Sequence, residues 1–82
     1  VDLIELTPEV SIIELEAGGQ LLGRSLRDLD LRARYGVTVL AVRRGSQVVV
    51  PPAADEKFRP GDVLVLVGGN SGLERVQALA AG

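Results

Sequence analysis

The spacing of hydrophobic residues changes along the chain, and each change predicts a different element. Residues 10–16 are apolar and partly β-branched over the length of a strand, and the run stops at two glycines, so we expect a strand there. Between residues 22 and 36, apolar side chains recur at helical spacing, which predicts an amphipathic helix. Its start resembles a capping box made by Ser25 and Asp28, and Gly36 is typical of a helix end. The apolar positions that define this helix are Leu22, Leu26, Leu29 and Ala33.

The second half of the chain reads as three strands and a helix. Two apolar runs, residues 37–42 and 47–50, are joined by a short turn with glycine and predict a β-hairpin that two prolines end. After a polar loop, residues 63–67 form the clearest strand pattern of the chain. Residues 68–71 then break this strand and supply a helix cap. The last helix carries one apolar face made by Leu73, Val76, Leu79 and Ala80.

This order of strand, helix, three strands and helix predicts an α+β fold, with a small mixed β-sheet and two helices. The 82 residues suit one small domain, which we place at residues 10–82, and residues 1–9 are read as either a linker or an edge strand. A chain of this size buries only about 60% of the surface that its unfolded form exposes, so a partner surface is expected.

Composition narrows the chemistry. The chain has no His, Cys, Met or Trp, which excludes the usual zinc sites, haem, iron–sulfur clusters, thiol nucleophiles and Ser-His-Asp catalysis. No apolar run approaches the roughly 18 residues that cross a bilayer, and the start carries no basic signal-peptide region, so we expect a soluble domain. The acidic pI of about 5.0, with one Tyr and one Phe, disfavours binding to a nucleic acid polymer.

Two glycine-rich segments need an explanation. The segment from Gly18 to Ser25 has nearly the spacing of a phosphate-binding loop, but Arg24 replaces the phosphate-binding lysine and two leucines occupy the loop. We interpret it as a glycine turn before a capped helix. Residues 68–72 also join a strand to a helix start, and without a dinucleotide-binding spacing they are read as a turn with a helix cap rather than as an anion site.

The carboxylates suggest no catalytic pair. We expect Asp28 and Asp30 to form ion pairs with the arginines four residues later in the helix, Asp62 to serve in a turn, and Asp55 and Glu56 to be solvated loop charges. Enzymatic activity and a metal site are therefore not expected.

Basic residues gather in the middle of the chain. Residues 24–44 hold six arginines against two aspartates, whereas residues 1–16 hold only acidic charges. Arg32 and Arg34 lie at the end of the first predicted helix, where positive charges interact favourably with the helix dipole. This role would be purely structural. The alternative is a site for a small anion, built where the helix end, an arginine fork and the following strand converge.

Three separated blocks of residues resemble the TrkA-C domain, also called the C-terminal domain of RCK (regulator of potassium conductance) proteins. The resemblance covers about residues 10–80. The blocks are Leu26-x-x-Leu29-Asp30-Leu31-Arg32-x-x-Tyr35-Gly36-Val37-Thr38-Val39-Leu40-Ala41-Val42-Arg43-Arg44-Gly45, Val49-Val50-Pro51 and Phe58-Arg59-Pro60-Gly61-Asp62-Val63-Leu64-Val65-Leu66-Val67-Gly68.

The resemblance implies a cytoplasmic, homodimeric regulatory domain that acts with a membrane-embedded potassium channel, cation–proton antiporter or other transporter. In several family members the dimer interface binds cyclic di-adenosine monophosphate (c-di-AMP), and no other cofactor is implied. Carried over by position, Leu31 and Pro51 would pack on the adenine, Arg32 would meet the phosphate, and Thr38 would bond the edge of the base or ribose. Thr38 departs from the family pattern, because nucleotide-binding members carry Asn there, which offers more hydrogen bonds than a hydroxyl.

Three functions remain open at this point. The first is a ligand-sensing regulatory dimer of a potassium or cation transport protein. The second is a dimerisation module with no ligand, whose arginines only solvate a helix. The third and weakest is a fragment of a nucleotide-hydrolysing protein that uses residues 18–25.

Overall fold

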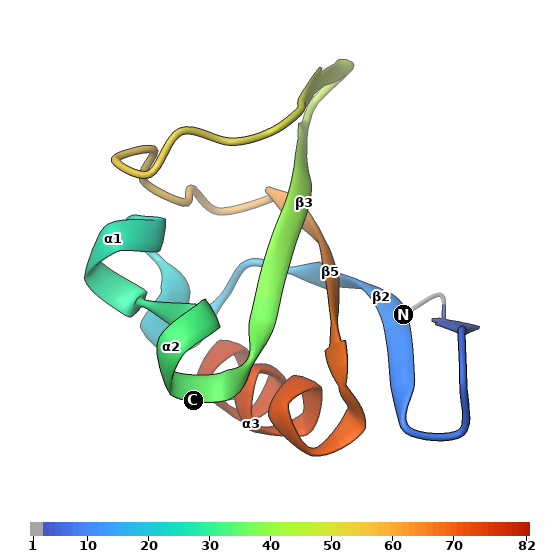
Figure 1. The fold of residues 1–82 in the computed structure, drawn as a ribbon. Helices are drawn as coiled ribbons and strands as arrows, with labels where there is room; N and C mark the ends of the chain where they lie inside the picture. Colours follow the sequence, from blue (N-terminus) through green and yellow to red (C-terminus); the bar gives the residue numbers. More distant parts are fainter. Residues whose placement is uncertain (1–2) are drawn as a thin grey trace.

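The computed structural model describes residues 3–82, which form one five-stranded sheet with helices packed on one of its faces (Figure 1). The elements are β1 (Leu3–Glu5), β2 (Val10–Glu16), the single 3-10 turn η1 (Gly19–Leu21), α1 (Leu26–Leu29), α2 (Leu31–Tyr35), β3 (Val37–Arg44), β4 (Gln47–Val49), β5 (Val63–Gly69) and α3 (Asn70–Ala81). Of the residues read as a linker or edge strand, Leu3–Glu5 pair with β2 as an edge strand, and residues 1–2 lie outside the described residues.

The strands lie in the order β1-β2-β5-β3-β4, and every neighbouring pair is antiparallel. The α+β class is confirmed, but the expected mixture of strand directions is wrong. The helices between β2 and β3 do return the chain so that these two strands run the same way. However, β5 lies between them and is antiparallel to both, so no two parallel strands are neighbours.

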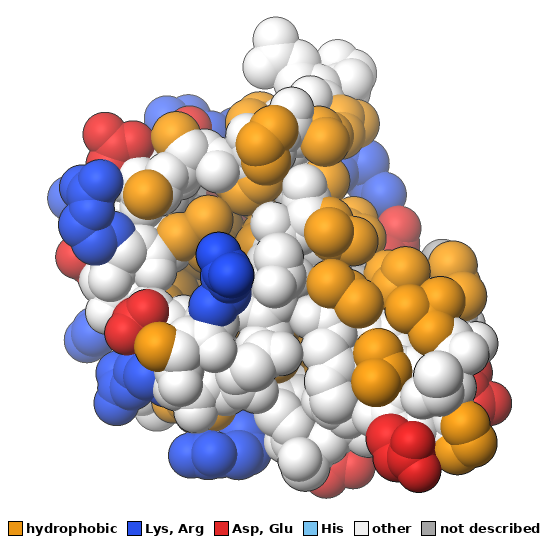
Figure 2. All heavy atoms as spheres, in the orientation of Figure 1, with side chains coloured by type: hydrophobic (Ala, Val, Ile, Leu, Met, Phe, Trp, Pro, Cys, Tyr) orange, Lys and Arg blue, Asp and Glu red, His pale blue; other side chains and the backbone are white. Residues whose placement is uncertain are grey.

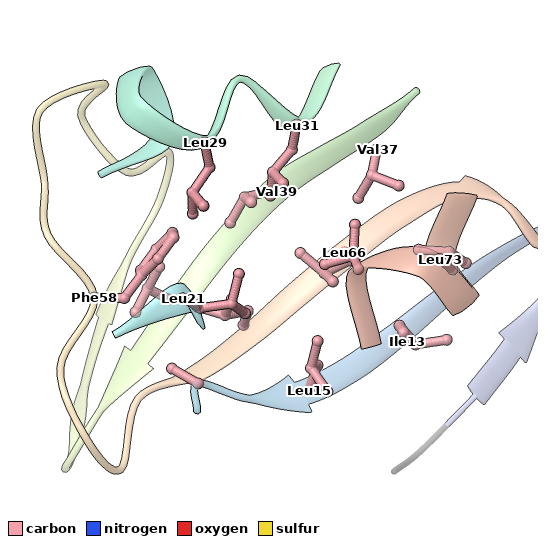
Figure 3. Packing of buried hydrophobic residues seen from close by; sticks show 14 residues of the cluster. Ile13, Leu15, Leu21, Leu29, Leu31, Val37, Val39, Phe58, Leu66 and Leu73 are labelled. Carbon is pink, nitrogen blue, oxygen red and sulfur yellow. The ribbon is translucent and has the colours of Figure 1, made fainter. Parts of the chain in front are cut away.

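The core lies between the sheet and the helices. Alternate residues of β2, β3 and β5 point to this side, because successive side chains of a strand face opposite ways. Phe58, from the loop before β5, closes one end of the core and is 1% exposed (Figure 3). The buried hydrophobic residues are Ile13, Leu15, Ala17, Leu21, Leu29, Leu31, Val37, Val39, Val42, Phe58, Leu64, Leu66, Leu73 and Val76.

The first predicted helix is in fact two short helices, α1 and α2, separated by Asp30. Asp30 has the left-handed backbone conformation, with φ 48° and ψ 49°. Leu29 and Leu31 are both buried, whereas in one continuous helix side chains two positions apart point about 200° away from each other. The break at Asp30 turns both leucines toward the core, and Ala33, expected on the apolar face, is exposed instead.

The predicted capping box is confirmed at the start of α1. The hydroxyl of Ser25 accepts a hydrogen bond from the N–H of Asp28 at 3.1 Å, and the Asp28 carboxylate accepts one from the N–H of Ser25, also at 3.1 Å. The bond from the Ser25 N–H is the main reason that the pKa of Asp28 is lowered. Within residues 3–82, neither predicted ion pair, Asp28 with Arg32 or Asp30 with Arg34, forms, because the helix that would align them is interrupted.

The hairpin of β3 and β4 is confirmed, with Arg44 facing Gln47 across a two-residue turn. The predicted end of β5 is wrong, because the strand continues through both glycines and α3 begins at Asn70. No side chain caps α3. The Asn70 side chain instead accepts a hydrogen bond from the hydroxyl of Ser11 at 2.8 Å and donates one to the carbonyl of Pro8 at 3.0 Å, which ties α3 to β2.

The two glycine-rich segments are places where backbones pack closely. A Cβ atom on Gly72 would collide with the carbonyl oxygen of Tyr35, so α3 can approach α2 only with glycine there. A Cβ atom on Gly18 would lie 2.7 Å from the Ala80 carbonyl oxygen at the end of α3. Leu21, inside the first segment, is fully buried. The interpretation of this segment as a turn before a capped helix is therefore confirmed over that of a phosphate-binding loop.

Candidate functional site

A groove of about 410 Å³ lies between α1, α2, the first half of β3 and the chain that follows β4. Figure 2 looks onto this side of the molecule, where a basic side chain lies among apolar ones in the space between the short helices and β3. The lining residues are Leu26, Arg27, Asp30, Leu31, Arg32, Val37, Thr38, Val39, Pro52 and Ala54.

The groove follows a free strand edge. β4 pairs only with residues 42–44 of β3, and the first half of β3 has β5 as its single strand neighbour within residues 3–82. The register between β3 and β5 shifts between Val39 and Ala41, where a β-bulge leaves Leu40 without a partner. An edge strand offers unpaired backbone groups along its open side. The groove therefore combines side chains from the helices with the backbone edge of β3.

The outer wall of the groove is attached to α1 by backbone hydrogen bonds. Pro52 is buried and Ala54 is exposed, and both line this wall. The carbonyl of Ala54 accepts a hydrogen bond from the N–H of Arg27 at 2.9 Å. Further along, the N–H of Phe58 donates to the carbonyl of Arg24 at 3.0 Å. These bonds fix the wall on the helix side of the groove.

An ion pair between the buried Asp62 and the partly exposed Arg44 holds the same loop on the strand side. Asp62, whose side chain is 2% exposed, accepts hydrogen bonds from Nε and Nη2 of Arg44 at 2.9 and 2.8 Å and from the N–H of Arg59 at 2.9 Å. Arg44 also donates to the Glu56 carboxylate at 3.1 Å and to the carbonyl of Lys57 at 3.2 Å. The bonds from Arg44, and secondarily that from Arg59, lower the pKa of Asp62, and the same carboxylates raise the pKa of Arg44. The expectation that Glu56 is only solvated is therefore wrong, and Asp62 does more than form a turn.

The structure brings three of the four residues expected at a ligand site into one groove. Arg32 is exposed on α2, Thr38 is half-buried on β3, and Leu31 is 2% exposed, so that only a small part of its side chain reaches the groove. Pro51 is exposed and is not among the lining residues, whereas the next residue, Pro52, is. That these residues contact a ligand stays a prediction.

Sequence reasoning missed Arg27 and Asp30 as lining residues. The signal for Asp30 was present: two leucines, Leu29 and Leu31, flank a residue type that tolerates the left-handed conformation. Arg27 had no such signal, because its place in the groove depends on the loop that packs beside it.

Several arginines of the basic middle segment already have partners. Arg43 lies 3.3 Å from the Glu14 carboxylate. The guanidinium of Arg34 lies 5.9 Å from the ring centre of Tyr35, and Arg75 of α3 lies 4.8 Å from the same ring, which are cation–π distances. Within residues 3–82, Arg27 and Arg32 are in no ion pair, and both line the groove.

The described residues 3–82 contain no group of three or more His, Cys, Asp or Glu side chains placed to hold a metal ion. No helix within them has the length and apolar character needed to cross a membrane.

Comparisons with known proteins agree on one family. The family profile described as the TrkA-C domain matches residues 10–81. The chain is 38% identical over 77 residues to Ktr system potassium uptake protein C of Bacillus subtilis (strain 168), covering 94% of this chain and 35% of that protein. It is 34% identical over 80 residues to the K(+)/H(+) antiporter subunit KhtT of the same organism, covering 93% of this chain and 48% of that protein. The chain thus spans less than half the length of each of these two relatives.

A solved structure gives the same result at the level of the fold. The RCK C domain of the potassium transport protein KtrA, in complex with c-di-AMP, superposes with a TM-score of 0.79 and is 36% identical in sequence. The match covers 85% of this chain and 82% of that one. The likeness therefore extends over most of both domains.

Proposed function

The chain belongs to the TrkA-C domain family, and we propose that it is the ligand-sensing regulatory domain of a potassium or other cation transport system. In this proposal the domain acts as a homodimer on the cytoplasmic side of the membrane and binds c-di-AMP in the groove beside β3. The main support is the coincidence of two observations. The groove gathers Leu31, Arg32 and Thr38, and a KtrA domain 36% identical to this chain was solved with c-di-AMP.

The chemistry of the groove suits half of a cyclic dinucleotide. A guanidinium such as that of Arg32 can donate two parallel hydrogen bonds to a phosphate, which is the geometry that favours Arg over Lys. Leu26, Val39 and Pro52 supply apolar surface on which a purine can pack. The volume of about 410 Å³ lies within the range of about 300–1,000 Å³ typical of small-molecule sites.

Two features support the proposed dimer: the symmetry of the ligand and the exposed apolar side chains beside the groove. c-di-AMP consists of two identical halves, and a two-fold dimer presents the same surface twice, so one ligand can occupy two symmetry-related grooves. Three large apolar side chains on β3, β4 and the residue after β4 are exposed: Leu40 at 39%, Val48 at 60% and Val50 at 67%. Apolar side chains exposed at the same edge of the sheet are suited to cover by a second copy.

Regulation follows if the ligand favours one arrangement of the two copies. A ligand shifts an equilibrium only by the difference between its affinities for the two states. Contact with both copies at once provides such a difference, because a change in the angle between the copies separates the two half-sites. The membrane partner would then respond to the geometry of the dimer.

Isothermal titration calorimetry with c-di-AMP tests the proposal. The wild-type domain is expected to bind one ligand per two chains. Arg32→Ala should weaken binding about 10- to 100-fold, the scale of a lost charge-assisted hydrogen bond. Arg34→Ala is the matched control, because it removes the same charge from the same short helix at a residue that does not line the groove.

Sedimentation in the ultracentrifuge distinguishes the remaining outcomes. A dimer that releases no heat with c-di-AMP would indicate a dimerisation module without this ligand. Equal loss of affinity in the Arg32 and Arg34 variants would show that general charge, rather than the groove, determines binding. A chain that stays monomeric with saturating c-di-AMP would contradict the proposed dimeric site.

A further inference from the structure

Asp30 carries a charge that the fold does not use. Asp30 is an exposed residue that lines the groove together with Arg27 and Arg32. It makes no hydrogen bond that caps α2, although the residue stands at the start of that helix. It is also in no ion pair within residues 3–82, so packing and capping leave its charge unexplained.

The backbone at this position requires a certain residue type but no charge. With φ at 48°, residue 30 is in the left-handed region, where Gly, Asn and Asp are the usual residues. Asn or Gly would satisfy the same backbone without a negative charge. The break between α1 and α2 therefore does not require the negative charge that Asp30 adds to the lining of the groove.

The carboxylate sets the net charge that the groove offers to an anion. The charged residues that line the groove are Arg27, Arg32 and Asp30, whose formal charges sum to one positive charge. A phosphodiester carries one negative charge, which the net positive charge of the groove balances. A terminal phosphate monoester carries about −1.5 to −2 at neutral pH, since its second pKa is about 6. Such a group would bring a surplus negative charge close to Asp30.

We propose that Asp30 is a specificity-determining residue, which makes the groove select phosphodiesters over nucleotides that end in a phosphate monoester or polyphosphate. The inference rests on the proposed function, because it concerns the same groove. Arg27 and Arg32 attract both classes of ligand, and Asp30 repels each in proportion to its charge. Linear breakdown products of a cyclic dinucleotide and the abundant nucleoside triphosphates are the ligands that this repulsion disfavours.

The size of the effect follows from Coulomb repulsion in a solvated groove. Two unit charges several ångströms apart near a protein surface, at physiological salt, change an equilibrium constant about threefold. Removing the Asp30 charge should then improve affinity about threefold for each negative charge of the ligand. The gain in affinity is therefore larger for the more highly charged ligands, which the wild-type domain disfavours.

The test measures affinities of the dimeric domain for three ligands at pH 8: c-di-AMP, the linear dinucleotide pApA and ATP, with about two, three and four negative charges. Asp30→Asn and Asp30→Gly both remove the charge and keep the backbone conformation. In both variants the preference for c-di-AMP over pApA should fall about threefold, and the preference over ATP about tenfold. Glu16→Gln is the control, because it removes a carboxylate that is exposed at the end of β2 and does not line the groove.

Each result has one meaning. If the wild-type domain does not bind c-di-AMP, the proposed function fails. If the wild-type domain binds c-di-AMP but both Asp30 variants keep the wild-type preferences, or lose c-di-AMP binding, the role of Asp30 is wrong and the proposed function stands. If Glu16→Gln changes the preferences as much as Asp30→Asn, the selectivity comes from overall charge and the inference also fails. The inference is supported only if the preference for c-di-AMP falls in both Asp30 variants and does not fall in Glu16→Gln.

Discussion

Replacing Asp62 with Asn tests the ion pair that holds the outer wall of the groove. Asn keeps the shape of the side chain but carries no charge and has one carbonyl oxygen in place of two acceptor oxygens. In the wild-type protein those two oxygens receive hydrogen bonds from Nε and Nη2 of Arg44 and from the N–H of Arg59, at 2.8–2.9 Å. The variant therefore loses the paired geometry and the attraction between the two charges.

The expected loss of stability is about 2–3 kcal/mol at pH 7. Hydrogen bonds to a charged partner contribute about 1.5–3 kcal/mol, and removing one member of a fully buried pair costs about 3–5 kcal/mol. The Asp62 side chain is 2% exposed, but Arg44 is 23% exposed and keeps its bond to Glu56 at 3.1 Å. The guanidinium is thus left partly solvated and partly paired, which favours the lower part of the range.

The difference between the two proteins should depend on pH with a definite sign. The pKa of Asp62 is lowered in the folded state, so the unfolded chain takes up its proton first as the pH falls. The ion pair then contributes its full stability above the unfolded pKa of about 3.9 and loses it as the pH falls toward the lower folded value. Asn does not titrate. The gap between wild type and Asp62→Asn should be constant from about pH 5 to 8 and shrink below about pH 4.

Urea unfolding followed by far-UV circular dichroism measures this gap, since the chain has no Trp to report by fluorescence. The control is Asp55→Asn, which makes the same substitution at an exposed residue of the same loop that is in no ion pair within residues 3–82. A cost below about 0.5 kcal/mol at pH 7 is the scale of an ordinary surface substitution and would refute the argument. A gap that stays unchanged at pH 3 would refute the assignment of the lowered pKa.

Two further stability predictions concern backbone packing and capping. Gly72→Ala should destabilise the fold by about 1–3 kcal/mol in urea unfolding, even though Ala favours helices by about 1 kcal/mol, because the new Cβ meets the Tyr35 carbonyl. Gly69→Ala is the control, with its nearest atom 3.9 Å away, and equal effects would contradict the clash. Ser25→Ala should cost about 1 kcal/mol by removing the cap of α1, whereas Ser71→Ala, at a helix start without a side-chain cap, should cost little. Equal costs for the two serine variants would argue against the capping box.

The sequence predicts those parts of the fold that depend on local spacing. β2 and β5 alternate buried and half-buried residues over most of their length, and runs of apolar, β-branched residues mark both strands in the sequence. The turn of the hairpin and the cap at Ser25 also depend on residues that are close in sequence. The relative direction of neighbouring strands does not depend on residues that are close in sequence. It is decided by the insertion of β5 between β2 and β3, which joins segments far apart in the chain.

The grouping of residues in the groove could be predicted in part, for the same reason. Leu31, Arg32 and Thr38 lie within eight consecutive residues that turn from α2 into β3, so the sequence places them together. Which of two adjacent prolines lines the groove depends on how the chain leaves β4: Pro52 lines it, and the contact of Pro51 with a ligand, which the family resemblance implies, stays a prediction. The pairing of Arg44 with Asp62 spans 18 residues and has no local pattern.

The anchoring of the groove wall bears on how a ligand would act on the proposed dimer. One end of the wall is bonded to α1 through the Arg27 N–H and the Ala54 carbonyl, and the other end is held by Arg44 through Glu56 and Lys57. If the groove is half of the proposed ligand site, the single chain already holds its wall in place, so little binding free energy is needed to order the wall. The remaining free energy can favour the dimer arrangement in which both half-sites meet the ligand. Asp62→Asn leaves the Arg44–Glu56 bond but removes the carboxylate that fixes the Arg44 guanidinium, so this end of the wall should be held less firmly. Binding of c-di-AMP should then weaken while the groove residues themselves stay unchanged.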